Sequence, residues 1–178
     1  EVSRLARSGA VVGLCPITES SLGDGIFRAV DYRQHGGQFA VGSDSNIRVS
    51  LAEELRTLEY SQRLRDRGRA VLADPGESTA RSLFEAVLAG GTQACGRDSG
   101  VIRVGAWADL LALDTEAVDA VGRSQDLLLD SFVFARGDRM VQDLWSAGRH
   151  LVREGRHILH DELTARYRAT LQTLMAAL

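Results

Sequence analysis

Residues 38–46 hold the side chain best placed for chemistry. The short apolar run Gln38–Gly42 ends on Ser43, Asp44 and Ser45. An aspartate is a good turn former, because its side chain can bond its own backbone two residues on. A carboxylate at the C-terminal end of a parallel strand also lies where barrel and doubly wound enzymes place their reactive groups. This segment alone leaves both interpretations of Asp44 open.

Two further acidic residues follow an earlier apolar run. Residues 10–15 are short and rich in β-branched side chains, as expected of a buried strand, and Pro16 ends them. The polar segment 17–25 contains Glu19 and Asp24 and predicts a surface loop. If the two strands are parallel neighbours, both loops emerge on one face, and three clustered carboxylates there need a cation or protons.

The elements that must position these groups alternate between strand and helix. Ser50 and Glu53 match a capping box, which predicts a helix from residue 50 to 67 with Glu54 facing water or a partner. Further helices are predicted at 26–34 and at 78–88, the latter ended by Gly90-Gly91. Strands that alternate with helices indicate a parallel sheet, and two strands alone are too few for a stable one.

The pattern changes near Gly96. Short apolar runs separated by glycine turns predict several strands, at 99–105, 108–114, 131–135, 140–147 and 150–158. This arrangement is typical of a small β-sandwich. Apolar residues at helical spacing then predict a closing amphipathic helix at 162–178.

Composition excludes several classes of protein. The 178 residues are 44% hydrophobic and carry a net charge of −3, with basic and acidic residues interspersed. We therefore expect a globular protein that binds no nucleic acid. No apolar stretch reaches membrane-spanning length, so we expect no membrane contact and an intracellular, cytoplasmic location. Cys15 and Cys95 are expected to be reduced.

No complete metal or nucleophile motif is present. The four histidines (35, 150, 157 and 160) form neither a His-x-His pair nor a His-Glu-x-x-His helix. The tail pair His157 and His160 is interpreted as solvent-exposed rather than metal-binding. There is no P-loop, and the serines around Asp44 have no histidine nearby in sequence.

Five segments together resemble the N-formimino-L-glutamate deiminases of the amidohydrolase superfamily. They are residues 13–27 (GLCPITESSLGDGIF), 42–46 (GSDSN), 53–64 (EELRTLEYSQRL), 100–114 and 147–157. The resemblance covers nearly the whole chain. Ile17 and Arg28 depart from it, where a small polar residue and a proline are expected.

The resemblance implies an α/β fold: the C-terminal part of a (β/α)8 barrel, then part of a small β-sandwich and a terminal helix. We therefore expect barrel elements at 1–96, sandwich strands at 97–161 and the helix at 162–178. Most of the barrel is expected to precede Glu1, so we expect this segment to be inactive by itself. The long helix 50–67 is a candidate dimer contact, and we expect a homodimer.

For the site, the resemblance implies that Asp44 is both a ligand of a single catalytic Zn²⁺ and the proton carrier of a hydrolysis. The reaction would convert N-formimino-L-glutamate to N-formyl-L-glutamate and ammonia. Ser43 and Ser45 are candidates to orient Asp44, and Glu19 or Asp24 to contact substrate. The other metal ligands are expected upstream of Glu1. A guanine, cytosine or adenosine type deaminase of the same superfamily, or a non-catalytic α/β interaction module, are the alternatives.

Overall fold

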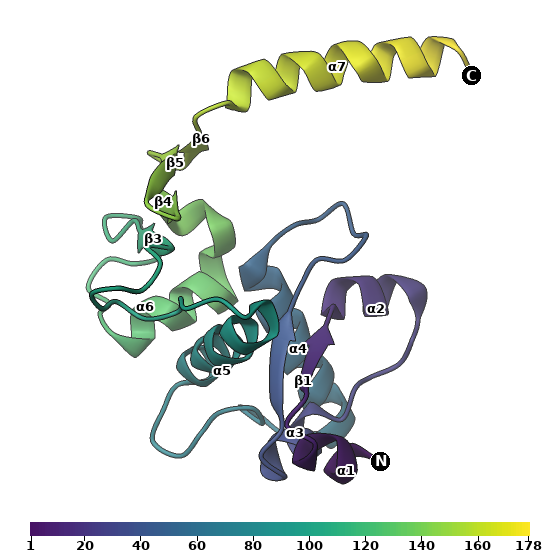
Figure 1. Cartoon of the computed structure of the whole chain (residues 1–178), viewed down its shortest axis with the longest axis vertical. Helices are drawn as coiled ribbons and strands as arrows, with labels where there is room; N and C mark the ends of the chain where they lie inside the picture. Colours follow the sequence, from purple (N-terminus) through teal and green to yellow (C-terminus); the bar gives the residue numbers. More distant parts are fainter.

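The computed structural model describes all 178 residues as a mixed α/β body with a helical arm (Figure 1). The first half alternates between helix and strand: α1 Val2–Arg7, β1 Val11–Leu14, α2 Pro16–Leu22, α3 Ala29–Gln34, β2 Gln38–Val41, α4 Leu51–Asp66 and α5 Thr79–Cys95. The second half contains β3 Leu110–Leu113, α6 Asp126–Ser131, β4 Val141–Ser146, β5 Arg149–Arg153, β6 Arg156–His157 and α7 His160–Ala176.

Strands β1 and β2 pair in parallel, in the register Val11 to Gln38 through Leu14 to Val41. Strands β3, β4, β5 and β6 form a second sheet in that order, with every neighbour antiparallel. The predicted parallel pair is therefore confirmed. The predicted strands at 108–114, 140–147 and 150–158 are also confirmed, as β3, β4 and the β5–β6 pair of one four-stranded sheet.

One hydrophobic core joins the two halves. It contains Tyr32, Phe39, Leu55 and Leu83 from the first half and Phe132 from the second. These side chains are almost completely buried. Helices α4 and α5 pack on the β1–β2 pair, and α4 also packs against the segment after α6. The core therefore crosses residue 96, where the sequence predicts a domain boundary, and that boundary stays a prediction.

Several predicted elements are wrong. The predicted loop 17–25 is largely helix α2, because Pro16 occupies its first turn, where proline is favourable, and Gly23 closes it in the left-handed region at φ 76°. Helix α5 passes through Gly90-Gly91 to Cys95. Residues 99–105 form turns rather than a strand. Residues 131–135 are helical, since α6 continues into a π-helical turn at Phe132–Arg136.

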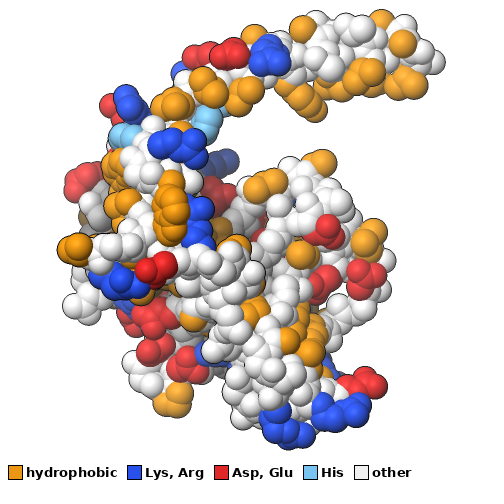
Figure 2. Space-filling view, viewed as in Figure 1, with side chains coloured by type: hydrophobic (Ala, Val, Ile, Leu, Met, Phe, Trp, Pro, Cys, Tyr) orange, Lys and Arg blue, Asp and Glu red, His pale blue; other side chains and the backbone are white.

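Helix α7 confirms the predicted closing helix and projects from the body as an arm (Figure 1). None of its residues is buried. Its apolar side chains, among them Leu163, Tyr167 and Leu174, are exposed along the arm, as Figure 2 shows. No helix of the chain is both long and apolar enough to cross a bilayer.

Candidate active site

The candidate site lies where β1 and β2 end. Because these strands are parallel and in register, their C-terminal ends lie side by side, and the amide of Gly42 donates to the carbonyl oxygen of Leu14 at 3.0 Å. Cys15 follows one strand and Ser43-Asp44 follows the other. The prediction that both connections emerge at the same edge is confirmed, and this edge is where α/β enzymes place their reactive groups.

Asp44 occupies a tight turn and leaves its carboxylate exposed. Its φ is 48°, a left-handed conformation that aspartate tolerates better than most residues. The turn closes with the amide of Asn46 donating to the carbonyl oxygen of Ser43 at 3.0 Å. The nearby Arg48 pairs with Glu53 instead of Asp44. The carboxylate is therefore available to a ligand, although it also serves the turn.

Helix α2 is fastened to this edge by its first turn. The Glu19 Oε1 atom accepts a hydrogen bond from the amide of Cys15 at 2.7 Å. The hydroxyl of Thr18 donates to the carbonyl oxygen of Ser43 at 3.1 Å, which links α2 to the residue before Asp44. These contacts fix the start of α2 beside the Asp44 turn.

Glu54, predicted to face water or a partner, is buried within the chain and only 2% exposed. Its Oε2 atom accepts from the amide of Ile17 at 3.0 Å, and its Oε1 atom is buried without any hydrogen-bond partner. Burial raises the pKa of Glu54, while the Ile17 amide lowers it and the charges of Glu19 and Glu53 raise it further. Its spacing to Leu51 and Leu58 places it on the apolar stripe of α4, a signal that could have revealed it.

The thiol of Cys15 lies near several acidic side chains. Burial raises the pKa of its thiol most, followed by the charges of Asp44, Glu54 and Glu19. A hydrogen bond with the Gly42 backbone opposes these effects. The structure therefore gathers Asp44, Glu19 and Glu54 around one thiol, and two of these three carboxylates were predicted to lie together.

The remaining predicted residues are placed differently. Asp24 follows Gly23 beyond the C-terminal end of α2, is exposed, and is not among the charges that act on Cys15. Ser43 is half-buried and Ser45 exposed. The bonds to Ser43 use its backbone oxygen. Its orienting role, like that of Ser45, stays a prediction.

The side chains at this edge supply one possible metal ligand and do not form a complete metal site. No group of three or more His, Cys, Asp or Glu side chains is arranged to hold a metal ion. Glu19 and Glu54 each already accept a backbone amide, and the raised pKa of Cys15 favours its neutral thiol over the thiolate that metals bind. Asp44 alone offers a free carboxylate, and a catalytic zinc has three or more protein ligands.

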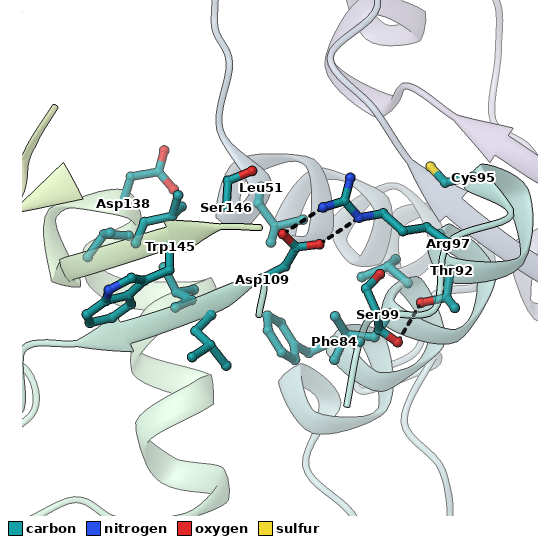
Figure 3. A pocket seen from close by; sticks show the side chains of 18 of the residues that line it. Leu51, Phe84, Thr92, Cys95, Arg97, Ser99, Asp109, Asp138, Trp145 and Ser146 are labelled. Atoms are coloured by element: carbon teal, nitrogen blue, oxygen red, sulfur yellow. Dashed lines mark hydrogen bonds and ion pairs between the residues drawn. The ribbon is translucent and has the colours of Figure 1, made fainter. Parts of the chain in front are cut away.

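A separate pocket of about 670 Å³ lies between α5 and the β3–β4 strands (Figure 3). Its wall is mainly apolar and includes Phe84 and Trp145. Its lining also contains the charged pair Arg97 and Asp109. The Arg97 Nη2 atom donates to Asp109 Oδ1 at 3.1 Å, whereas Nε lies 2.9 Å from Oδ2 without hydrogen-bond geometry. None of the predicted site residues lines this pocket.

The histidines do not form a site either. His157 accepts from the amide of Leu159 at 3.2 Å, and His160 is the exposed first residue of α7. His150 lies 2.6 Å from Asp143 and stacks on Trp145. Cys15 and Cys95 are both free.

An α/β body whose free carboxylate follows one of two parallel strands is typical of barrel hydrolases. Residues 1–151 match the model of the amidohydrolase family, and the chain belongs to this family. It is 51% identical over 158 residues to the formimidoylglutamate deiminase of Pseudomonas aeruginosa, covering 88% of this chain and 35% of that protein. It is 38% identical over 120 residues to a 5-methylthioadenosine/S-adenosylhomocysteine deaminase of Halobacterium salinarum, covering 66% of this chain and 26% of that protein.

Solved structures agree on the fold. An amidohydrolase from Brucella melitensis superposes with a TM-score of 0.89 at 42% identity, covering 98% of this chain and 38% of that one. A zinc-bound adenosine deaminase from Xanthomonas campestris gives 0.78 at 23% identity, covering 97% and 40%. The predicted fold class is confirmed as part of an amidohydrolase barrel. The matched part of the chain spans 35% of the length of the first of these curated relatives and 26% of the second.

Proposed function

We propose that the full-length protein containing this chain is a metal-dependent N-formimino-L-glutamate deiminase. The observation that carries this proposal is the 51% identity, over 88% of the chain, to a formimidoylglutamate deiminase. The exposed Asp44 carboxylate at the end of β2 supports it chemically. In this reaction water adds to the formimino carbon across its C=N bond. The bond from this carbon to the terminal nitrogen then breaks, which yields N-formyl-L-glutamate and ammonia. The reaction is a step of histidine degradation.

Asp44 is the proposed metal ligand and proton carrier. One Zn²⁺ per subunit, when bound, would supply a Lewis acid that lowers the pKa of water toward neutrality. The Asp44 carboxylate takes a proton from the attacking water, and the resulting acid returns it to the departing nitrogen. The remaining ligands lie outside this chain under this proposal, and the isolated segment is inactive.

Residues near Asp44 have supporting roles in the proposal. Glu19 lies at the correct edge to meet a substrate, although one of its oxygens already accepts the Cys15 amide. Asp24 would reach the substrate only from the far end of α2. Ser43 and Ser45 would orient the Asp44 carboxylate. An increase in KM with little change in kcat for Glu19→Gln or Asp24→Asn would identify a substrate contact.

The wider assignments rest on the resemblance. They are a barrel segment at 1–96, sandwich strands at 97–161, a helix at 162–178, a homodimer and a cytoplasmic location. Sedimentation of the purified full-length protein tests the homodimer, and a monomer would contradict it.

A purine-type deaminase is the second candidate, because the chain is 38% identical over 66% of its length to a 5-methylthioadenosine/S-adenosylhomocysteine deaminase. Ammonia release by the full-length protein from N-formimino-L-glutamate, S-adenosylhomocysteine, adenosine and guanine distinguishes the candidates. We expect release from the first compound alone.

The role of Asp44 is tested in the same assay. We expect near-stoichiometric zinc in the wild type and a loss of at least about 100-fold in kcat for Asp44→Asn. Asp161→Asn, an exposed acid on α7, is the matched control and should retain wild-type activity. Unchanged activity of Asp44→Asn would reduce Asp44 to a turn residue and contradict the proposed mechanism.

A further inference from the structure

Glu54 is a buried acid that the proposed reaction does not use. It lies in the first turn of α4, between Ala52 and Leu55, whose side chains are completely buried in the core. Helix α4 packs on the rest of the body through this core, so its backbone is a rigid platform. A carboxyl group at only 2% exposure on such a platform costs free energy unless it makes a specific contact.

The contact that Glu54 makes leads directly to Asp44. Glu54 Oε2 accepts from the amide of Ile17 at 3.0 Å, across 37 positions of sequence. The next residue, Thr18, is also buried and donates its hydroxyl to the carbonyl oxygen of Ser43 at 3.1 Å. Ser43 precedes Asp44. Two hydrogen bonds therefore connect the platform of α4, the first turn of α2 and the turn that presents Asp44.

We propose that Glu54 is a positioning residue that holds the first turn of α2 in place and, through Thr18, fixes the Asp44 turn for the reaction. This inference rests on the proposed function for its effect on catalysis. Glu54 touches neither the reacting atoms nor Asp44 itself. It acts through the backbone, as an acceptor that only a residue on α4 supplies to the amide of Ile17.

The environment of Glu54 shows what kind of acceptor it is. Oε1 is buried and has no hydrogen-bond partner, so nothing there compensates a negative charge. Burial also raises the pKa of the Glu54 carboxyl group, which favours its neutral form. A neutral acceptor of the same shape is therefore sufficient. Glutamine should replace Glu54, whereas methionine, of similar length but without an acceptor, should not.

The test compares Glu54→Gln and Glu54→Met in the full-length protein, with Glu53→Gln as the matched control. Glu53 is the neighbouring acid on α4, and its carboxylate contacts Arg48 instead of α2. Two readouts are needed. The first is amide hydrogen exchange across residues 38–49 in metal-free protein, which requires neither substrate nor zinc. The second is kcat and KM for deimination.

We expect Glu54→Gln to retain kcat within about twofold and Glu54→Met to lower it at least about 10-fold with a smaller change in KM, since a small displacement of a catalytic group mainly affects the transition state. Exchange at 42–46 should accelerate in Glu54→Met and stay unchanged in Glu54→Gln and Glu53→Gln. A merely structural residue would change global stability without this local pattern.

The variants Thr18→Val and Thr18→Ser test the hydrogen bond from the Thr18 hydroxyl to the Ser43 carbonyl oxygen. They also test the proposed positioning role if Glu54→Met does not fold. Valine removes the hydroxyl at nearly constant volume and should reproduce the faster exchange at 42–46, whereas serine keeps the hydroxyl and should not. The proposal is overturned if Glu54→Gln is as impaired as Glu54→Met, or if exchange at 42–46 is unchanged in Thr18→Val. If the wild type releases no ammonia, the proposed function fails, while the exchange data still decide the positioning role.

Discussion

Gly90 of α5 lies directly against the backbone of Phe39 in β2: a Cβ atom at Gly90 would stand 2.0 Å from the Phe39 carbonyl oxygen. No real Cβ approaches a backbone oxygen so closely. Phe39 is buried in the core, and β2 ends on the turn that carries Asp44. The close approach of α5 to β2 therefore supports the strand that presents the candidate site, and it explains a glycine inside a long helix.

Gly90→Ala should lower the free energy of unfolding by about 2 kcal/mol or more, because the added methyl group forces α5 away from β2. Gly91→Ala is the matched control, since a Cβ at Gly91 meets nothing within 4 Å. Alanine is favoured over glycine in a helix by about 1 kcal/mol, so this control should be neutral or stabilising. Urea denaturation of the full-length protein measures both, and equal stabilities would contradict the predicted contact.

Glu54 predicts a pH dependence of stability. Burial raises its pKa in the folded protein above the ordinary value of 4.5. The folded state then binds more protons than the unfolded state between 4.5 and the raised pKa, so the contribution of Glu54 to stability is fully present below pH 4.5 and is lost as pH rises through the folded pKa.

Glu54→Gln removes this titration. We expect the stability of this variant relative to the wild type to increase as pH rises from 4.5 and to level off above the folded pKa of Glu54. Urea denaturation at several pH values between 4 and 7.5 measures the difference. A difference that does not change with pH would show that Glu54 ionises as freely in the folded protein as in the unfolded chain.

Local signals in the sequence were sufficient for much of the fold. The capping box at Ser50 predicted the start of α4, and the Ser50 hydroxyl does accept from the amide of Glu53 at 3.2 Å. The β-branched run at Val11 and Val12 predicted β1, which pairs in parallel with β2 as expected. These elements were predictable because their own residues determine them.

The errors occur where distant contacts override local preference. The Gly90-Gly91 pair predicts a helix end, yet the helix continues, and a glycine is needed at position 90 because the backbone of Phe39, far away in sequence, lies against it. The apolar residues 131–135 predict a strand, but they continue α6 instead, with Phe132 and Val133 in the core. A short apolar run does not distinguish a buried strand from a buried helix.

In the candidate site, too, some residues were predictable from the sequence and one was not. Asp44 and Glu19 were predicted to lie together from the order of strands and loops alone, and both act on Cys15. Glu54 was missed because a glutamate on a helix is usually exposed. Its burial follows from the packing of α4 against α2, and the signal for it in the sequence is its helical spacing to Leu51 and Leu58.

The helix cap at Ser50 gives a third prediction. Ser50→Ala should destabilise the full-length protein by about 1 kcal/mol, because the amide of Glu53 loses its acceptor. Ser50→Asp supplies an equivalent acceptor and should retain wild-type stability. Thermal denaturation followed by circular dichroism measures both variants. Equal melting temperatures for the alanine and aspartate variants would show that this cap does not contribute.

The two cysteines should differ in reactivity. Burial and the nearby charges of Asp44, Glu54 and Glu19 raise the pKa of the Cys15 thiol. At pH 8 a smaller fraction of Cys15 is therefore thiolate than for an ordinary cysteine, and the thiolate is the reactive form. Cys95 is exposed. In metal-free full-length protein treated with iodoacetamide, peptide mass spectrometry should therefore show alkylation of Cys95 before Cys15.

Asp44→Asn provides the sharper form of this prediction. Removing one of the negative charges near Cys15 lowers the thiol pKa, so its alkylation at pH 8 should become faster, while that of Cys95 stays constant as an internal reference. Asp161→Asn should change neither rate, because Asp161 is not among the charges that act on Cys15. If Asp44→Asn leaves the Cys15 rate unchanged, Asp44 does not face Cys15, and the arrangement of acids at the ends of β1 and β2 differs from the one described.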